Sequence, residues 1–108
     1  MSDFVLLFRQ GERQLSADEQ RQRTDDVRTW AQQQIADGRT LDPRMLSDHV
    51  ASANGSSSST AERPVIALLF LDARDVDDAL AVANTHPGLR YGSSIEVRAW
   101  TSPIAARS

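Results

Sequence analysis

The segment PVIALLFL, at positions 64–71, decides the fold because apolar side chains fill both of its alternating faces. A strand that is covered on one side alternates apolar and polar residues, since successive side chains point to opposite faces of a sheet. Here one alternating set is Val65, Ala67, Leu69 and Leu71, and the other is Ile66, Leu68 and Phe70. The pattern therefore predicts a central strand at residues 64–72 that is covered on both faces.

The composition is typical of one globular domain. Of the 108 residues, 40% are hydrophobic and 25% are charged. We expect a single domain at 1–102 and a short tail at 103–108. The 12 basic side chains, all arginine, are scattered among 15 acidic ones, and the formal net charge is -3. This charge distribution disfavours nucleic acid as a partner.

Some classes of protein and site are excluded by what the sequence lacks. Cysteine is absent, so disulfides and thiolate sites are excluded. No segment approaches the roughly 20 apolar residues of a membrane span. The apolar run near the N-terminus is too short for a signal peptide, so a cytoplasmic protein without a membrane partner is expected.

Local signals predict the remaining elements. Ser16 and Glu19 have the spacing of a capping box, and Gly38 suits a left-handed helix end. Asp75 is expected to cap a second helix, which His86-Pro87-Gly88 stops. The elements in chain order are a strand at 4–8, a helix at 17–37, an irregular edge strand or broken hairpin within 39–53, a loop at 54–62, the strand at 64–72, a helix from 75 and a strand at 93–100.

Apolar stripes indicate which helix faces are buried. The residues expected to pack are Val27, Trp30, Ala31 and Ile35 on the first helix and Val76, Ala79, Leu80 and Ala83 on the second.

The β-α-β-β-α-β order predicts an α+β fold with an antiparallel sheet, the ferredoxin-like arrangement. In that topology the first and third strands are central, and both helices cover the same face of the sheet. The helices then cover only one apolar set of the strand at 64–72, and the second set must be covered by something else. We expect a homodimer that pairs through this sheet face. The alternative is that the loop at 47–62 folds over the sheet.

Candidate binding residues follow from the same strand pattern. Arg9 ends the first strand, Arg98 and Trp100 share one face of the last, and Arg44 lies in the irregular segment. An arginine and an aromatic ring beside a cavity suit a small anionic or aromatic ligand. The alternative is that Arg98 pairs with Glu96 or with a partner carboxylate, while Trp100 seals the dimer.

Metal and cofactor chemistry finds little support. His49 follows Asp48, but adjacent strand residues point to opposite faces. His86 precedes Pro87 at a helix C-terminus, where the dipole favours an imidazolium and a capping role. The acidic stretch DARDVDD, at 72–78, lacks the spacing of a calcium loop and is explained by helix capping. We therefore expect neither a metal nor a cofactor.

Four segments, FVLLFR, DGR, PVIALLFLDARDVDDALAVANTHPG and IEVRAW, together resemble the YCII-related family and especially its DGPF branch. The resemblance covers nearly the whole chain and implies a dimeric α+β barrel. A His–Asp pair is proposed as catalytic in some members, and Asp37 corresponds to the acidic residue. The chain departs from the family because NGSSSSTAERP replaces the DGPF motif and the first helix has no histidine. Without that histidine, Asp37 is a weak general base.

Three functions follow as hypotheses. The first is a small-molecule-binding homodimer of uncertain catalytic activity, with a pocket between the helices, the 39–53 segment and the partner sheet. The second is a lyase or isomerase that uses His49 or Asp37 for acid–base chemistry and an arginine to hold an anionic substrate. The third is a structural or regulatory interaction module.

Overall fold

The computed structural model describes residues 2–47 and 64–101. These residues form a four-stranded antiparallel sheet in the order β2-β3-β1-β4. The elements along the chain are β1 (Ser2–Arg9), α1 (Ala17–Ala36), β2 (Leu41–Met45), β3 (Val65–Ala73), α2 (Val76–Asn84), the 3-10 helix η2 (Pro87–Tyr91) and β4 (Ser94–Ala99). The predicted fold class is confirmed: the chain has the ferredoxin-like β-α-β-β-α-β order with β1 and β3 in the centre of the sheet.

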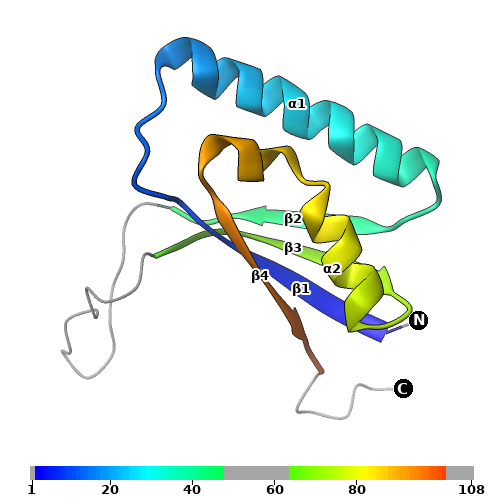
Figure 1. Cartoon of the computed structure of the whole chain (residues 1–108). Helices are drawn as coiled ribbons and strands as arrows, with labels where there is room; N and C mark the ends of the chain where they lie inside the picture. Colours follow the sequence, from blue (N-terminus) through cyan, green and yellow to red (C-terminus); the bar gives the residue numbers. More distant parts are fainter. Residues whose placement is uncertain (1, 48–63, 102–108) are drawn as a thin grey trace, which may run out of the picture.

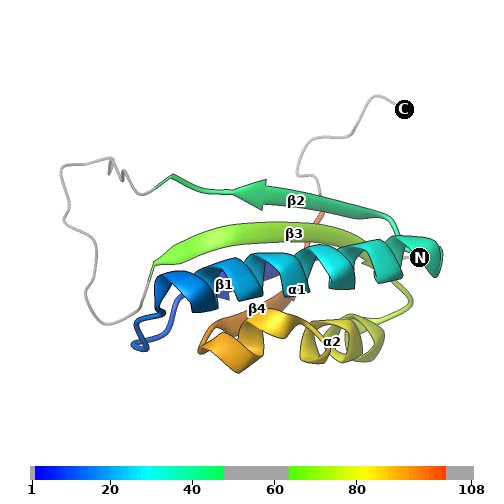
Figure 2. The ribbon, with the colours of Figure 1, turned by 90° about the horizontal axis from the view of Figure 1, so that it is seen from above.

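Both helices lie on one face of the sheet, and Figures 1 and 2 show this two-layer arrangement from the side and from above. Helix α1 contacts β2 on one side of the layer, whereas α2 contacts β3, β1 and β4 on the other. The core between the layers contains Phe4, Leu6 and Phe8 of β1, Leu69, Leu71 and Ala73 of β3, Trp30 of α1, and Ala79, Val82 and Ala83 of α2. The opposite face of the sheet carries no described helix.

The predicted helix signals are confirmed. At the start of α1 the Ser16 hydroxyl accepts from the Glu19 backbone N–H (3.1 Å), and the Glu19 carboxylate accepts from the Ser16 backbone N–H (3.0 Å). Gly38 follows α1 with φ of 97°, a left-handed conformation that favours glycine. Asp75 caps α2 by accepting from the Asp78 N–H at 2.8 Å.

The predicted helical stripes are partly wrong. Ile35 is 58% exposed, and Gln34 takes the inward position instead. On α2, Val76 and Leu80 are 53% and 46% exposed, whereas Val82 is buried. With 3.6 residues per turn, either of two adjacent residues at the margin of an apolar stripe can be the buried one. The position of the sheet relative to the helix decides which residue it is.

A register shift between Phe8 and Arg9 of β1 breaks the strict alternation that was expected of the strand at 64–72. Phe8 pairs with Ala67 and Arg9 pairs with Val65, so that Ile66 has no partner in this register. Both Ile66 and Ala67 pack against the core, as expected for the two residues of a bulge. Ile66 therefore does not share a face with Leu68 and Phe70, contrary to the sequence prediction.

The segment that the sequence left open contains a regular edge strand, β2, which pairs with β3 alone among the described strands. Pro43 lies in the middle of β2, and an edge position tolerates its missing N–H. The expected loop at 54–62, and with it the alternative cover for the sheet, lies outside the described residues.

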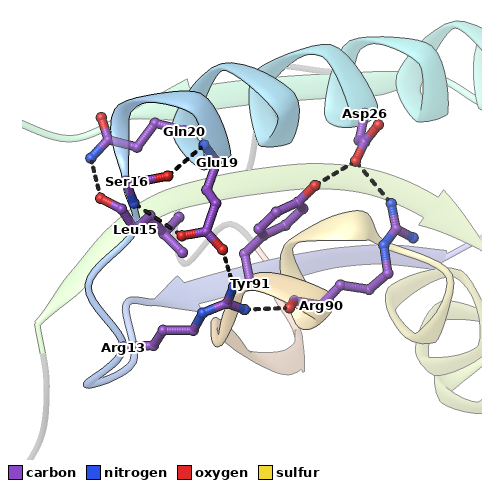
Figure 3. Close-up of polar contacts among 8 residues, drawn as sticks. All are labelled: Arg13, Leu15, Ser16, Glu19, Gln20, Asp26, Arg90 and Tyr91. Atoms are coloured by element: carbon purple, nitrogen blue, oxygen red, sulfur yellow. Dashed lines mark hydrogen bonds and ion pairs between the residues drawn. The ribbon is translucent and has the colours of Figure 1, made fainter.

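An element that the sequence did not predict, η2, follows α2 and is joined to α1 by polar contacts (Figure 3). Asp26 of α1 accepts from the Tyr91 hydroxyl at 2.8 Å and from the Arg90 guanidinium at 3.1 Å. These contacts, first among them the Tyr91 hydrogen bond, hold the pKa of Asp26 below its usual value. Arg13 adds a link, because it donates to the Arg90 carbonyl (3.0 Å) and pairs with Glu19.

Candidate functional site

The side of the sheet that the described helices leave uncovered has an apolar centre, which we call the open face: Val5, Leu7, Leu68 and Phe70. Val5 pairs with Phe70 and Leu7 pairs with Leu68, so the four side chains are neighbours on adjacent central strands. The residues that alternate with them are buried beneath the helices. All four are half-buried although no described helix covers them.

Charged side chains border the open face at both edges of the sheet. On the β4 side, the Glu96 carboxylate lies 3.7 Å from the guanidinium of Arg9 and 3.7 Å from that of Arg98. On the β2 side, Arg44 pairs with Asp42 at 3.0 Å. The sequence alternative, in which Arg98 pairs with Glu96, is therefore the arrangement seen within one chain. Three of the predicted ligand-binding residues thus border one surface.

Trp100 extends the apolar part of this surface. Its ring lies edge-on to Phe70, with centroids 5.6 Å apart and planes at 81°. The Trp100 backbone N–H donates to the Asp3 carbonyl at 3.2 Å, which continues the β1–β4 pairing by one residue beyond β4. The indole remains 40% exposed. The structure thus places the fourth predicted ligand-binding residue on the same face as the three arginines.

Asp37 lies on the other side of the sheet, in the helical layer. It lines a groove of about 700 Å³ between the end of α1, the start of β2 and α2. The lining residues are Gln34, Asp37, Gly38, Arg39, Thr40, Asp72, Arg74, Asp78, Ala81, Val82 and Thr85. Asp37 and the four residues of the open face therefore do not form one site.

The charges in this groove largely satisfy one another. Arg39 pairs with Asp78 at 3.0 Å and donates to the Asp72 carbonyl at 3.4 Å. The Arg74 backbone N–H donates to Asp78 (3.0 Å), and this bond and the Arg39 bond lower the pKa of Asp78. Asp37 is exposed at the groove wall, where its carboxylate can accept a hydrogen bond from a hydroxyl group or pair with a cationic group. Sequence reasoning missed the Arg39–Asp78 pair because no local spacing links two residues so far apart.

His86 is buried, and the expected imidazolium at the end of α2 is wrong. Its ring packs between Phe8 and Trp30, with centroids 4.7 Å from each. The Nδ1 atom accepts from the Gly88 N–H at 2.9 Å, so His86 caps η2 rather than α2. Burial lowers the pKa of His86 to about 4, so the ring is neutral at pH 7. The capping role was predicted correctly, but for the wrong helix.

The second histidine, His49, lies outside the described residues. Within 2–47 and 64–101, no three His, Asp or Glu side chains converge as metal ligands do. The described helices include none long and apolar enough to cross a bilayer. A scan of protein-family models finds no match to this chain, and a search of curated proteins finds none either.

Proposed function

We propose that this protein is a homodimer that pairs through the open face and binds a small anionic or aromatic molecule at the margin of that face. The same proposal includes a relation to the YCII-related proteins, which rests on the sequence resemblance alone. The observation that carries the proposal is the composition of the open face, where an apolar centre is bordered by guanidinium groups and an exposed indole.

The dimer is supported by the apolar residues of the open face. Val5, Leu7, Leu68 and Phe70 are adjacent in the two central strands, and Trp100 adds an exposed ring beside them. Burying apolar surface contributes about 25 cal/mol per Å². A second copy presents the same apolar surface and buries an equal area, as a two-fold symmetric interface requires. Sheets that pack face to face do so through such interdigitating side chains.

The ligand is supported by the chemistry of the margin. Arg98 is well exposed, and its contact with Glu96 at 3.7 Å leaves several of its N–H groups for another acceptor. A guanidinium binds carboxylates and phosphates in a forked geometry, and an indole face stacks on flat rings. Arg98 and Trp100 are two positions apart on one strand face, so one small molecule can contact both.

The dimer is tested by Leu68→Asp, which places a charge in the centre of the open face. Light scattering of the wild-type chain should give twice the chain mass of 11.9 kDa at micromolar concentration, and Leu68→Asp should give the monomer mass. Ile35→Asp is the control, because it also replaces an apolar residue by a carboxylate but lies on α1, away from the open face; Ile35 is 58% exposed, whereas Leu68 is half-buried. A wild-type monomer, or a Leu68→Asp variant that is still dimeric at the same micromolar concentration, would contradict the proposal.

The ligand site is tested by fluorescence titration with small aromatic carboxylates. Binding should change the Trp100 emission, and Arg98→Ala should weaken the affinity by about tenfold, the usual cost of losing a charge-assisted hydrogen bond. Arg74→Ala is the control, because Arg74 is an exposed arginine on the helical side. Trp100→Phe should abolish the signal and thereby separate it from Trp30. Equal affinity in the Arg98 and Arg74 variants would exclude this site.

A second candidate function, an acid–base lyase or isomerase, is favoured by the position of Asp37 in the groove. In this proposal Asp37 or His49 moves the proton, and an arginine holds an anionic substrate. Asp37→Asn should abolish any turnover of small ring compounds or lactones, whereas Asp77→Asn, an exposed change on α2, should leave it intact. His49→Ala tests the other base in the same assay. Turnover that survives both substitutions would rule out these roles.

A further inference from the structure

Within the described residues, no second strand pairs with the outer edge of β4. Among the described strands, β4 has only β1 as a neighbour. The Trp100 N–H donates to the Asp3 carbonyl, so Trp100 and every second residue before it on β4 direct their backbone groups toward β1. Because hydrogen-bonding direction alternates along an antiparallel strand, Ile95, Val97 and Ala99 direct their N–H and C=O groups away from β1. These outward groups form a template for strand pairing.

The charges of β4 suit a second copy of the same strand in one register only. When two copies pair antiparallel about an axis at Val97, Glu96 of each lies opposite Arg98 of the other. An axis at position 96 would place Glu96 against Glu96, and an axis at 98 would place Arg98 against Arg98. Charged edge strands usually discourage pairing, but here the order of signs is self-complementary.

The Val97 register also agrees with the hydrogen-bonding parity. The backbone N–H and C=O of Val97 point away from β1, so two copies exchange a pair of backbone hydrogen bonds at the axis. Ile95 and Ala99 then pair across the interface in the same way. Glu96 and Arg98 fall at the narrower, non-hydrogen-bonded positions, where opposite side chains come closest.

An apolar strip lies beside this edge in the helical layer. Val76 and Leu80 are 53% and 46% exposed. A helix turns about 100° per residue, so these two point away from Asp78, Ala81 and Thr85, which line the groove beside α1. Helix α2 lies on the β4 side of the helical layer (Figure 2). The helix geometry therefore directs Val76 and Leu80 outward, toward the β4 edge.

We propose that the outer edge of β4 binds the β4 edge of a second copy, antiparallel about an axis at Val97, with Val76 and Leu80 of both copies packing beside it. The contact uses the outer edge of β4 rather than the four residues of the open face, although Glu96 and Arg98 also border that face. Each copy contributes the acid to one ion pair and the base to the other, so the interface is isologous.

The first test removes the open-face contact and then the edge. In Leu68→Asp protein, concentrated until association is detected by light scattering, Ala99→Pro should abolish that association. Proline removes an outward N–H that β1 does not use, so circular dichroism should show an intact fold. Ala99→Val is the control and should still associate. The absence of any association in Leu68→Asp, or association that resists Ala99→Pro, would overturn the proposal.

The second test mixes two charge variants in the same Leu68→Asp background. Glu96→Arg and Arg98→Glu alone each place like charges opposite, and should weaken association by about tenfold. Their equimolar mixture pairs an all-basic edge with an all-acidic one and should restore it. Recovery on mixing cannot arise from contacts within one chain. A mixture no stronger than its components would overturn the proposal.

The two proposed interfaces fail separately. If Leu68→Asp leaves the wild-type mass unchanged while Ala99→Pro lowers it, the open-face dimer is wrong and the edge contact stands. If Leu68→Asp gives a monomer at every concentration, the edge contact is wrong and the open-face dimer stands. Leu7→Asp, at the paired position on β1, replaces Leu68→Asp if that variant does not fold.

Discussion

His86 owes its chemistry to the groups that surround it in space rather than to its sequence neighbours. Phe8 and Trp30 enclose its ring, and Gly88 donates to Nδ1, so the proton of the neutral ring is on Nε2. A second proton would have to displace the Gly88 hydrogen bond in a buried site. Trp30, which packs against this ring, is itself held by a 2.8 Å bond from its Nε1 to the Thr85 hydroxyl.

The His86 environment predicts a loss of stability in mild acid. The folded pKa is lowered to about 4, whereas the unfolded value is near 6.5, so the unfolded chain binds more protons between these values. The stability is fully present above pH 6.5 and falls as the pH decreases toward 4. Urea unfolding should show about 2 kcal/mol less stability at pH 5 than at pH 7 from this group.

A variant isolates this effect from other titrating groups. His86→Asn keeps an acceptor for the Gly88 N–H but does not titrate, so its stability should change less between pH 7 and pH 5. The lowered pKa values of Glu19, Asp26 and Asp78 affect stability mainly below this range. An equal pH dependence in the wild type and His86→Asn would contradict the prediction.

At the scale of elements, α1 depends on its ends and its polar contacts more than on its packing. Trp30 is its one buried residue among those described, and most of its surface is solvated. The Ser16–Glu19 capping box at its start and the Asp26 contacts with η2 therefore contribute to its position (Figure 3). A helix with so narrow an apolar stripe gains little from burial alone.

Ser16→Ala should therefore lower the free energy of unfolding by about 1 kcal/mol, the typical cost of a lost N-cap. Thr24→Ala, in the exposed middle of α1, is the control and should leave stability nearly unchanged, because alanine has the higher helix propensity. Both values come from urea titrations of the two variants. A smaller loss for Ser16→Ala than for Thr24→Ala would show that the cap does not stabilise α1.

At the scale of the whole molecule, the proposed open-face dimer links stability to concentration. An interface that forms only between folded chains raises the thermal midpoint as protein concentration rises. The wild-type midpoint should therefore increase with concentration, and the dependence should be much weaker in Leu68→Asp. This thermal measurement complements the mass measurement, because it detects association under unfolding conditions.

The sequence alone was sufficient for the order of elements and their caps. Ser16, Gly38 and Asp75 act through hydrogen bonds and backbone angles within a few residues, so local spacing predicts them. The doubly apolar strand at 64–72 predicted a central position, which the strand order confirms. For the candidate site, the strand pattern correctly grouped Arg9, Arg98 and Trp100, because alternation assigns a face to every strand residue.

Tertiary structure decided what depends on residues far apart in the chain. The bulge at Ile66 turned that side chain toward the core, against which it packs, the layer geometry exposed Ile35 and Leu80, and burial made His86 neutral. It also placed Asp37 on the opposite side of the sheet from the arginines. Local spacing specifies hydrogen bonds between near neighbours, but the surroundings of a side chain depend on how whole elements pack against one another.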